Sequence, residues 1–243
     1  MGRRVFLAGA GGAIGKRLVP LLLGAGHAVF GTTRSSVRAR ELAAAGIEPV
    51  VVDVFDAPTL SRKMAGIRPE IVIHQLTDLP PGLDPTRMAD ATARNARIRD
   101  EGTRNLVSAA VAAGVRQLIA QSIAWVYAPG PEPHVEDDPL DTAAEGPRAI
   151  SIGGVVALER WTLYSPPLRG VVLRYGRIHG PGTGAETPRE HTPLHVDAAA
   201  SAALLAMETG ASGIFNIAEP NPHVAIDKAR RELGWDPDFR LAE

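Results

Sequence analysis

Short apolar runs alternate along the chain with longer segments in which apolar residues recur at helical spacing. The runs predicted to be strands are Arg4–Ala8, Ala28–Thr32, Glu48–Val52, Ile71–Gln75, Gln117–Gln121, Gly170–Leu173 and Gly213–Ile217. The helices predicted between them are Ala13–Leu23, Val37–Ala45, Arg87–Ala113, Ala149–Leu163 and Asp197–Glu208. Strands that alternate with helices in this way predict an α/β fold built on a doubly wound parallel sheet.

Length and composition favour a single domain over residues 1–243. The 243 residues are 45% hydrophobic, which is enough for a full core, and no linker or internal repeat interrupts the pattern. The segment Arg87–Ala113 is long enough to cross the whole sheet, and Pro20 predicts a mild kink in the first helix. The loop Ala128–Pro147, rich in Pro, Gly, Asp and Glu, either walls a ligand crevice or is a solvated surface turn.

Three glycines directly after the first strand have the spacing of a phosphate-binding loop. Gly9, Gly12 and Gly15 stand in the segment AGAGGAIG, where Ala13 and Ile14 open the following helix. One glycine permits a tight turn, another lets the backbone approach a pyrophosphate, and the third lets helix and strand pack closely. Because the helix N-terminus faces the anion, this context predicts a Rossmann fold that binds a dinucleotide.

The end of the second predicted strand favours NADP over NAD. An acidic residue usually stands there in NAD-binding proteins to hold the ribose hydroxyls, but no Asp or Glu precedes Glu41. Arg34 instead offers a guanidinium group for the 2′-phosphate of NADP, aided by the hydroxyls of Ser35 and Ser36. We therefore expect NADP to be the cofactor and NAD to bind more weakly.

Charge, cysteine content and histidine spacing argue against several other functions. A formal net charge of -1 lacks the basic surplus that nucleic-acid binding needs, and the absence of cysteine removes thiolate chemistry. His191 and His195 have the spacing of two metal ligands on a helix, but Pro193 between them disfavours a helix, so no metal is expected. The chain has no GxSxG motif of a hydrolase and no apolar stretch long enough for a membrane. Its N-terminal apolar run is too short for a signal peptide, which predicts a cytoplasmic protein.

Several segments carry a resemblance that runs in one order over nearly the whole chain. They are AGAGGAIG (8–15), VVDVFD (51–56), IVIHQLT (71–77), GTRNLVSAAVAAGVRQLIAQSIAWVYAPG (102–130), LRYGRIHGPG (173–182), HVDAAASAALLA (195–206) and KARRELGWDP (228–237). In these segments the chain resembles the NAD-dependent epimerase/dehydratase family, the extended short-chain dehydrogenases/reductases. The resemblance is specific for fold and cofactor binding and not for the reaction.

The resemblance implies a series of cofactor contacts along the carboxyl edge of the sheet. From the adenine, through the middle of the cofactor, to the nicotinamide, they would come from Asp53, Val54, Gln75, Leu76, Thr77, Ser122 and the backbone of Tyr175–Ile178.

The usual catalytic residues of that family are missing. Its general acid/base is a tyrosine whose pKa is lowered by a lysine four residues later, on the helix after the fifth strand. Alignment through Glu159 places Ser151 at the tyrosine position and Val155 at the lysine position. A serine hydroxyl is far too weak an acid to replace that tyrosine. The family's catalytic Ser/Thr position falls on Ile123, one residue after Ser122.

A proton donor in this chain would therefore be non-standard. The candidates are Tyr127, Ser122, Tyr175 and His179, although both tyrosines and His179 also fit packing or turn roles. The leading hypothesis is an NADP(H)-dependent oxidoreductase or epimerase-like enzyme that acts on a small carbonyl or hydroxyl metabolite. Two alternatives stay open: an NADP-binding sensor or partner-binding module without redox turnover, and a non-redox enzyme on the same fold.

The C-terminal part is shorter than the resemblance leads one to expect. Gly182 is followed within a few residues by His195, where the family normally inserts a substrate-covering segment, and a second shortcut runs from Asn216 to Lys228. This predicts a small substrate subdomain within 176–243, whose pocket is either open or covered by a partner subunit. Family members commonly pair through the two helices predicted at Arg87–Ala113 and Ala149–Leu163. The second helix is rich in apolar residues, so a homodimer is expected: Ile150, Ile152, Val155, Val156, Leu158 and Trp161.

Overall fold

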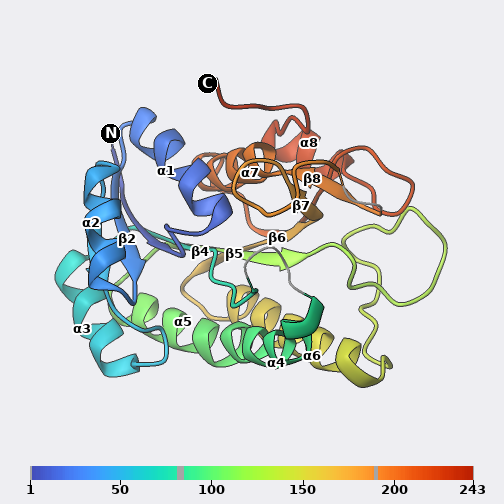
Figure 1. Cartoon of the computed structure of the whole chain (residues 1–243), viewed down its shortest axis with the longest axis horizontal. Coiled ribbons are helices and arrows are strands. Elements are labelled where there is room, and N and C mark those ends of the chain that lie inside the picture. The colour runs from blue at the N-terminus through green and yellow to red at the C-terminus, as the bar shows by residue number, and fades with distance from the viewer. Residues whose placement is uncertain (1, 81–84, 189–190, 243) are drawn as a thin grey trace.

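The computed structural model describes residues 2–80, 85–188 and 191–242, and a seven-stranded parallel sheet forms its centre (Figure 1). The sheet order is β3-β2-β1-β4-β5-β6-β9. The strands are β1 Arg4–Ala8, β2 Ala28–Thr33, β3 Glu48–Val51, β4 Ile71–His74, β5 Gln117–Ile123, β6 Arg169–Tyr175 and β9 Gly213–Ile217. The order reverses at β1, with β2 and β3 on one side and β4, β5, β6 and β9 on the other. The predicted doubly wound α/β fold is confirmed.

Each face of the sheet has its own helices and its own apolar cluster, because side chains alternate along every strand. Val5 and Leu7 of β1 pack in the cluster that also holds residues of α1 and α7, whereas Phe6 and Ala8 pack in the cluster of α3 and α5. In Figure 1, α1, α7 and α8 lie above the sheet, and α3 to α6 lie below it. The helices are α1 Ala13–Gly24, α2 Ser36–Ala44, α3 Ala57–Ile67, α4 Met88–Arg97, α5 Thr103–Ala112, α6 Gly146–Leu163, α7 Val196–Glu208 and α8 Asp227–Leu233.

The long helix predicted over Arg87–Ala113 is interrupted. A 3-10 turn, Pro85–Arg87, leads into α4, and a π-helical turn, Ile98–Gly102, separates α4 from α5. A π turn widens the helix by one residue, which the spacing of apolar positions does not reveal. The helix α1, in contrast, runs through Pro20 to Gly24 without ending.

Two helices and a small sheet lie where the apolar pattern predicts no element. The helix α3 begins after Asp56, whose side chain accepts a hydrogen bond from the backbone N–H of Thr59 at 3.1 Å. The helix α8 and the pair β7 (Arg177–His179) and β8 (Pro193–His195) are short. For α8, β7 and β8, two helical turns or three strand residues give too few positions to establish a period.

The C-terminal segment packs into the same core as the N-terminal strands. Leu194, Val224, Leu233 and Trp235 belong to the apolar cluster that contains Val5. This shared core is the arrangement expected for one domain with few elements added after β6.

Candidate functional site

A cavity of about 800 Å³ lies at the carboxyl ends of the first four strands. Its walls include Gly9–Gly12 after β1, Thr32–Arg34 at the end of β2, Asp53–Phe55 after β3 and Gln75–Thr77 after β4. In doubly wound sheets, ligands bind at this edge, where the strand order reverses. The strand order therefore places a ligand site where the sequence predicts the dinucleotide.

The backbone of the glycine loop has room for a pyrophosphate group. Gly9 has a φ of 95°, and a Cβ there would lie 2.7 Å from the carbonyl carbon of Gln75. A Cβ at Gly15 would lie 2.3 Å from the carbonyl oxygen of Gly9, so α1 starts directly against the loop. Gly11 faces open space, and no side chain caps the start of α1 at Gly12. The N–H groups at the helix start thus remain for an anion, and the residues present fit a dinucleotide.

Some of the predicted loop residues line the cavity, and the others lie behind its wall. Gly9 and Gly12 line the cavity. Ala13, Ile14 and Gly15 do not, and Ile14 is buried in the apolar cluster of β1. These three residues would serve a cofactor through the position of the helix and not through their side chains.

Two arginines border the cavity where β2 leads into α2. Arg34 and Arg38 both line it, and within the described chain neither guanidinium group has a hydrogen bond or an ion pair. Ser35 is the N-cap of α2, and its Oγ accepts a hydrogen bond from the backbone N–H of Arg38 at 3.4 Å. Arg38, which was not predicted from the sequence, stands four residues after Arg34, in the first turn of α2. The pair forms a cationic border suited to a phosphate group.

Residues after β3 form the opposite wall of the cavity. Asp53 Oδ1 accepts a hydrogen bond from the backbone N–H of Phe55 at 3.0 Å, and the carbonyl oxygen of Val54 accepts one from Asn105 at 3.0 Å. The ring of Phe55 lines the cavity and lies 4.0 Å from Cζ of Arg97. Phe55 was not predicted from the sequence. It is an aromatic residue two positions after Asp53, and its ring offers an apolar surface for a base.

Gln75, Leu76 and Thr77 close one end of the cavity, here called the inner end, which lies farthest along the sheet from Arg34. The side-chain amide of Gln75 donates a hydrogen bond to the hydroxyl of Tyr175 at 3.4 Å. Since β4 neighbours β5, this end of the cavity leads toward the segments that follow β5 and β6. The geometry fits the predicted order from adenine to nicotinamide.

His74, the last residue of β4, is buried beside this inner end. Its Nδ1 accepts a hydrogen bond from the backbone N–H of Leu76 at 3.2 Å, and its Nε2 lies 3.1 Å from Oγ1 of Thr103. Burial, and then the charge of Arg99, lower the pKa of His74 to about 4. The imidazole is therefore neutral at pH 7.

The helix α6 carries Ser151 and Val155 at the two positions where the family resemblance expects tyrosine and lysine. Val155 is completely buried. The hydroxyl of Ser151 accepts a hydrogen bond from Nη1 of Arg99 at 3.3 Å. Neither side chain ionises near neutral pH, so these two positions supply no acid/base pair.

Ser122 and Tyr127 belong to a buried polar network around Arg174 and Glu159. Arg174 donates hydrogen bonds to both carboxylate oxygens of Glu159, at 2.9 and 2.7 Å, and to the hydroxyl of Tyr127 at 2.9 Å. Ser122 donates to Glu159 at 2.9 Å, and Tyr127 donates to Oδ1 of Asn216 at 2.6 Å. Burial, partly offset by Arg174, raises the pKa of Tyr127. Both hydroxyl protons are thus engaged within the protein.

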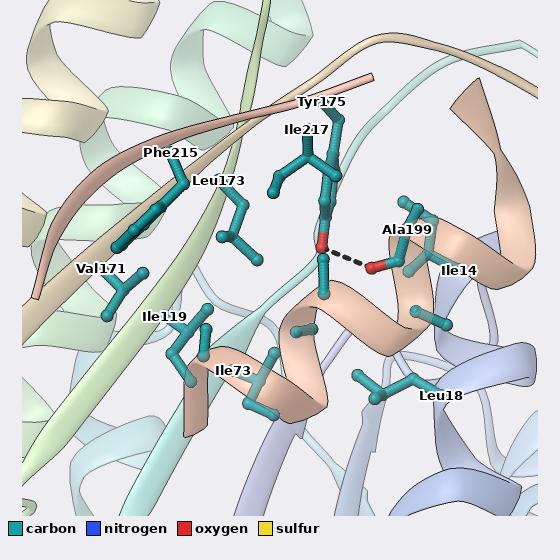
Figure 2. Packing of buried hydrophobic residues seen from close by; sticks show 14 of the residues in the cluster. Ile14, Leu18, Ile73, Ile119, Val171, Leu173, Tyr175, Ala199, Phe215 and Ile217 are labelled. Carbon is teal, nitrogen blue, oxygen red and sulfur yellow. Dashed lines mark hydrogen bonds between the residues drawn. The ribbon is translucent and has the colours of Figure 1, made fainter. Parts of the chain in front are cut away.

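Tyr175 points into the apolar cluster between the sheet and α7 (Figure 2). Its side chain is 1% exposed, and its hydroxyl donates a hydrogen bond to the carbonyl oxygen of Ala199 at 3.0 Å. Burial raises the pKa of Tyr175 well above that of an ordinary tyrosine. Its proton is therefore held more tightly than that of an exposed phenol.

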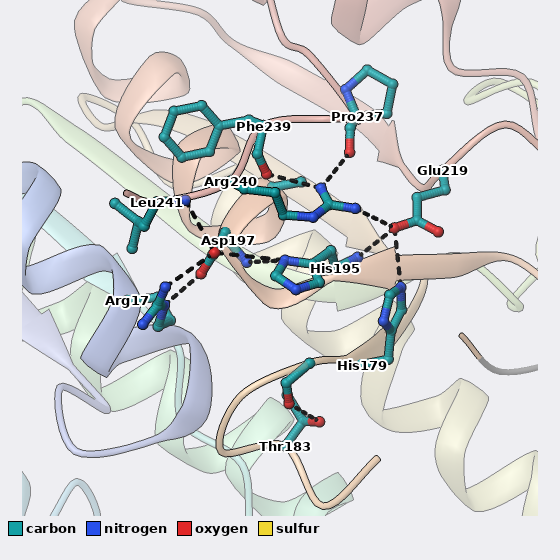
Figure 3. A network of polar contacts seen from close by, with 12 residues as sticks. Arg17, His179, Thr183, His195, Asp197, Glu219, Pro237, Phe239, Arg240 and Leu241 are labelled. Carbon is teal, nitrogen blue, oxygen red and sulfur yellow. Dashed lines mark hydrogen bonds and ion pairs between the residues drawn. The ribbon is translucent and has the colours of Figure 1, made fainter. Parts of the chain in front are cut away.

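His179 lies on β7 beside the C-terminal tail (Figure 3). Its Nε2 is 3.0 Å from Oε1 of Glu219, an oxygen that also accepts hydrogen bonds from the backbone of His195 and from Arg240. Its Nδ1 is buried and has no hydrogen-bond partner among the described residues. Tyr127, Ser122, Tyr175 and His179 all lie outside the cavity wall, and their catalytic roles stay predictions.

In the described ranges, no group of three or more His, Cys, Asp and Glu side chains is arranged to hold a metal ion. None of the helices in these ranges is long and apolar enough to cross a membrane. The cytoplasmic location stays a prediction.

Comparisons with known proteins agree with this geometry. Residues 9–148 match a family model described as NAD(P)H-binding. The 3-diazoavenalumate denitrifying reductase of a Streptomyces species is 40% identical over an alignment 268 positions long, which covers 98% of this chain and 84% of that protein.

Solved structures with low sequence identity share the fold. The Bordetella bronchiseptica enzyme WbmG in complex with NAD has a TM-score of 0.72 at 21% identity, covering 99% of this chain and 91% of that one. The Thermotoga maritima UDP-glucose 4-epimerase with UDP-glucose has a TM-score of 0.77 at 20% identity, covering 98% and 94%.

Proposed function

We propose that this chain, which belongs to the NAD(P)H-binding family, is an NADPH-dependent reductase of a small acid that bears a diazonium group. The observation that carries the proposal is the absence of an acid/base pair on α6, where Ser151 and Val155 stand. Such a site suits a reduction whose balance needs no proton. The Streptomyces relative, named as a denitrifying reductase of a diazo acid, supports this choice of substrate class.

Reduction of a diazonium group differs from that of a ketone in its proton balance. A ketone that gains a hydride becomes an alkoxide, which must take a proton from an acid to give the alcohol. A diazonium group, R–N₂⁺, that gains a hydride becomes the neutral diazene R–N=N–H, which loses N₂ to give R–H. Two electrons and one hydrogen enter, N₂ leaves, and no net proton is consumed. A site without a general acid therefore suffices for this reaction.

The protein's contribution would be to bind and orient. When bound, the reduced nicotinamide cofactor supplies the hydride. The start of α1 would hold the pyrophosphate, Arg34 and Arg38 the 2′-phosphate, and Phe55 the adenine. Gln75–Thr77 would then direct the nicotinamide toward the ends of β5 and β6, beside α6.

Turnover of a simple diazo acid tests the proposal. We expect the protein to convert 4-carboxybenzenediazonium and NADPH to benzoate, N₂ and NADP⁺ in equal amounts, followed by absorbance at 340 nm and chromatography of benzoate. The matched carbonyl compound, 4-carboxybenzaldehyde, should react at least about 100-fold more slowly, because a missing general acid typically costs 10²–10⁴-fold.

The enzyme-free reaction of NADPH with each compound is the control. Equal rates with the diazonium and the aldehyde would show that the protein has a proton donor, and the proposal would be wrong. NADPH that binds but is never consumed above the enzyme-free rate would favour the alternative of a sensor or partner-binding module.

Cofactor choice gives a prediction about Arg34. NADP should bind at least about tenfold more tightly than NAD, equivalent to roughly 1.4 kcal/mol. Replacing Arg34 with Asp should remove or reverse this preference, because the carboxylate repels the 2′-phosphate and can accept ribose hydroxyls. Arg40→Asp is the matched control, since Arg40 is exposed on α2, the helix that follows Arg34, and does not line the cavity. Superimposable titration curves for the two cofactors in the parent protein would contradict the prediction.

The homodimer stays a prediction. The apolar surface that α6 exposes is smaller than its sequence suggests. On α6, Ile152, Val155 and Leu158 are buried, whereas Ile150 is 49% and Val156 38% exposed. Light scattering at micromolar concentration should report a dimer for the parent and a monomer for the double substitution Ile150→Glu and Val156→Glu, because burying two carboxylates at an interface is unfavourable. A parent that is monomeric under these conditions would rule the dimer out.

A further inference from the structure

A buried arginine lies beside Ser151, one of the two positions on α6 where the family's acid/base pair is absent. Arg99 stands in the π-helical turn between α4 and α5, is 8% exposed, and donates a hydrogen bond to Ser151 at 3.3 Å. The residue before it, Ile98, lines the cavity together with Gln75–Thr77. Single π turns inside helices often occur at functional sites. Arg99 itself does not line the cavity, but its charge acts on His74, the residue before Gln75, and its Nη1 reaches the position that a tyrosine would hold.

The charge of Arg99 has no ion-pair partner in the part of the chain that the structure describes. Glu159, whose negative charge acts on it, is already bonded to Arg174 and Ser122. His74, which also acts electrostatically with it, is neutral at pH 7. Burial lowers the pKa of Arg99 to about 10, so the side chain is still cationic at neutral pH. A buried cation with one neutral hydrogen-bond partner is unfavourable until an anion joins it.

The guanidinium nitrogens of Arg99 that lack a hydrogen bond are not completely buried. None of its nitrogens is among the buried, unpartnered side-chain atoms of the described chain. A guanidinium group carries five N–H donors, and one of its nitrogens is engaged by Ser151. The planar arrangement of the remaining donors matches a carboxylate or another anionic oxygen.

We propose that Arg99 binds an anionic oxygen of the substrate beside the inner end of the cavity. This inference rests on the proposed function, and it names the residue that would bind the anionic oxygen of the acid. A guanidinium group keeps its protons at neutral pH, so Arg99 attracts and orients the substrate through its anionic oxygen and does not act as a general acid. Ser151, which accepts a hydrogen bond from Nη1, is a positioning residue for Arg99.

An equilibrium binding experiment tests the proposal without turnover. Cinnamate and cinnamamide have nearly the same shape, but cinnamate alone is an anion. Calorimetric titration of the NADP⁺-saturated protein should show at least about tenfold tighter binding of cinnamate. In Arg99→Met the two probes should bind equally, whereas Arg104→Met, an exposed arginine on α5, should keep the parent's preference. Equal binding of both probes by the parent, or a preference that survives in Arg99→Met, would overturn the proposal.

A second pair of variants keeps the arginine and changes its partner. Ser151→Asp gives Arg99 an internal carboxylate at hydrogen-bond distance, so the cinnamate preference should fall at least about tenfold below that of the isosteric Ser151→Asn. Because Ser151 is partly exposed, both variants are expected to fold, and this comparison decides the question if Arg99→Met does not. Equal preferences in Ser151→Asp and Ser151→Asn would overturn the proposal.

Stability separates a ligand-binding arginine from a structural one. Without an internal counter-ion to lose, Arg99→Met should unfold at the same temperature as the parent or higher, whereas a structural arginine would lower the midpoint. A clearly lowered midpoint together with an unchanged cinnamate preference would overturn the proposal. A cinnamate preference that depends on Arg99, in a protein that reduces no diazo acid, would uphold the anion site and reject the proposed reaction alone.

Discussion

Replacing Arg174 with Met is expected to lower the free energy of unfolding by about 3–5 kcal/mol, the cost of leaving a buried carboxylate without its cation. Arg174 is 2% exposed and Glu159 is 5% exposed. The arginine also donates to the hydroxyl of Tyr127 at 2.9 Å and to the carbonyl oxygen of Glu136 at 3.0 Å. Its removal leaves these buried acceptors with fewer partners or none. Chemical denaturation of parent and variant measures the loss.

Two further variants show whether the loss comes from the unpaired charge. Arg169→Met, at the exposed start of the same strand, should change stability by less than about 0.5 kcal/mol. The double substitution Arg174→Met and Glu159→Met should recover much of the loss, because a buried pair can be replaced by apolar side chains at little cost. A loss below about 1 kcal/mol for Arg174→Met alone would mean that water reaches Glu159 and that the network is not closed.

The same network has a consequence for the reaction. It joins Ser122 of β5, Arg174 of β6 and Asn216 of β9 to Glu159 of α6, beneath the end of the sheet where the nicotinamide is expected. Two of the predicted proton donors therefore contribute to stability in this arrangement. Their hydroxyl protons bond to fixed internal acceptors, which supports a reaction that takes no proton from them.

Gly9→Ala should weaken NADPH binding at least about 100-fold, equivalent to roughly 2.7 kcal/mol. The glycine has a φ of 95°, a region that side chains disfavour, and a Cβ there would lie 2.7 Å from the backbone of Gln75. The loop must therefore move away from β4, which shifts the N–H groups that would hold the pyrophosphate. Titration followed by NADPH fluorescence gives the dissociation constants.

Gly24→Ala is the matched control for this prediction. Gly24 ends α1, the helix that the loop begins, and a Cβ there meets no atom within 4 Å. Its replacement should leave NADPH binding unchanged and keep or slightly raise stability, since alanine favours the helix. A dissociation constant for Gly9→Ala within threefold of the parent's would show that the loop does not hold the cofactor.

The apolar pattern predicted all seven strands of the central sheet, with differences at their ends. The sixth strand, predicted as Gly170–Leu173, extends over Arg169–Tyr175, because pairing with β5 and β9 continues past the apolar run. Arg174 lies in this extension. A charged residue lowers the strand signal of a sequence, yet here the charge is buried and paired with Glu159.

The catalytic end of the site could be predicted only in part. The sequence shows that Ser151 and Val155 stand at the family's tyrosine and lysine positions, because these two positions are found from their spacing along one helix. It does not show that Arg99 reaches Ser151, from which it is separated by 52 positions. It also does not show that Tyr127 is bonded to Asn216, 89 positions away.

The sequence by itself determined the strands, the glycine loop and the arginine at the end of β2, because apolar alternation, backbone freedom and local charge belong to neighbouring residues. The tertiary structure alone decided which polar side chains are engaged and which are left for a ligand. Burial and hydrogen-bond partners depend on elements brought together from distant parts of the chain, as α6 meets the π turn at Arg99. For this reason Tyr127 and Arg99, which are both simply polar residues in the sequence, differ in the folded protein. The hydroxyl of Tyr127 is hydrogen-bonded internally, whereas the charge of Arg99 has no anionic partner among the described residues.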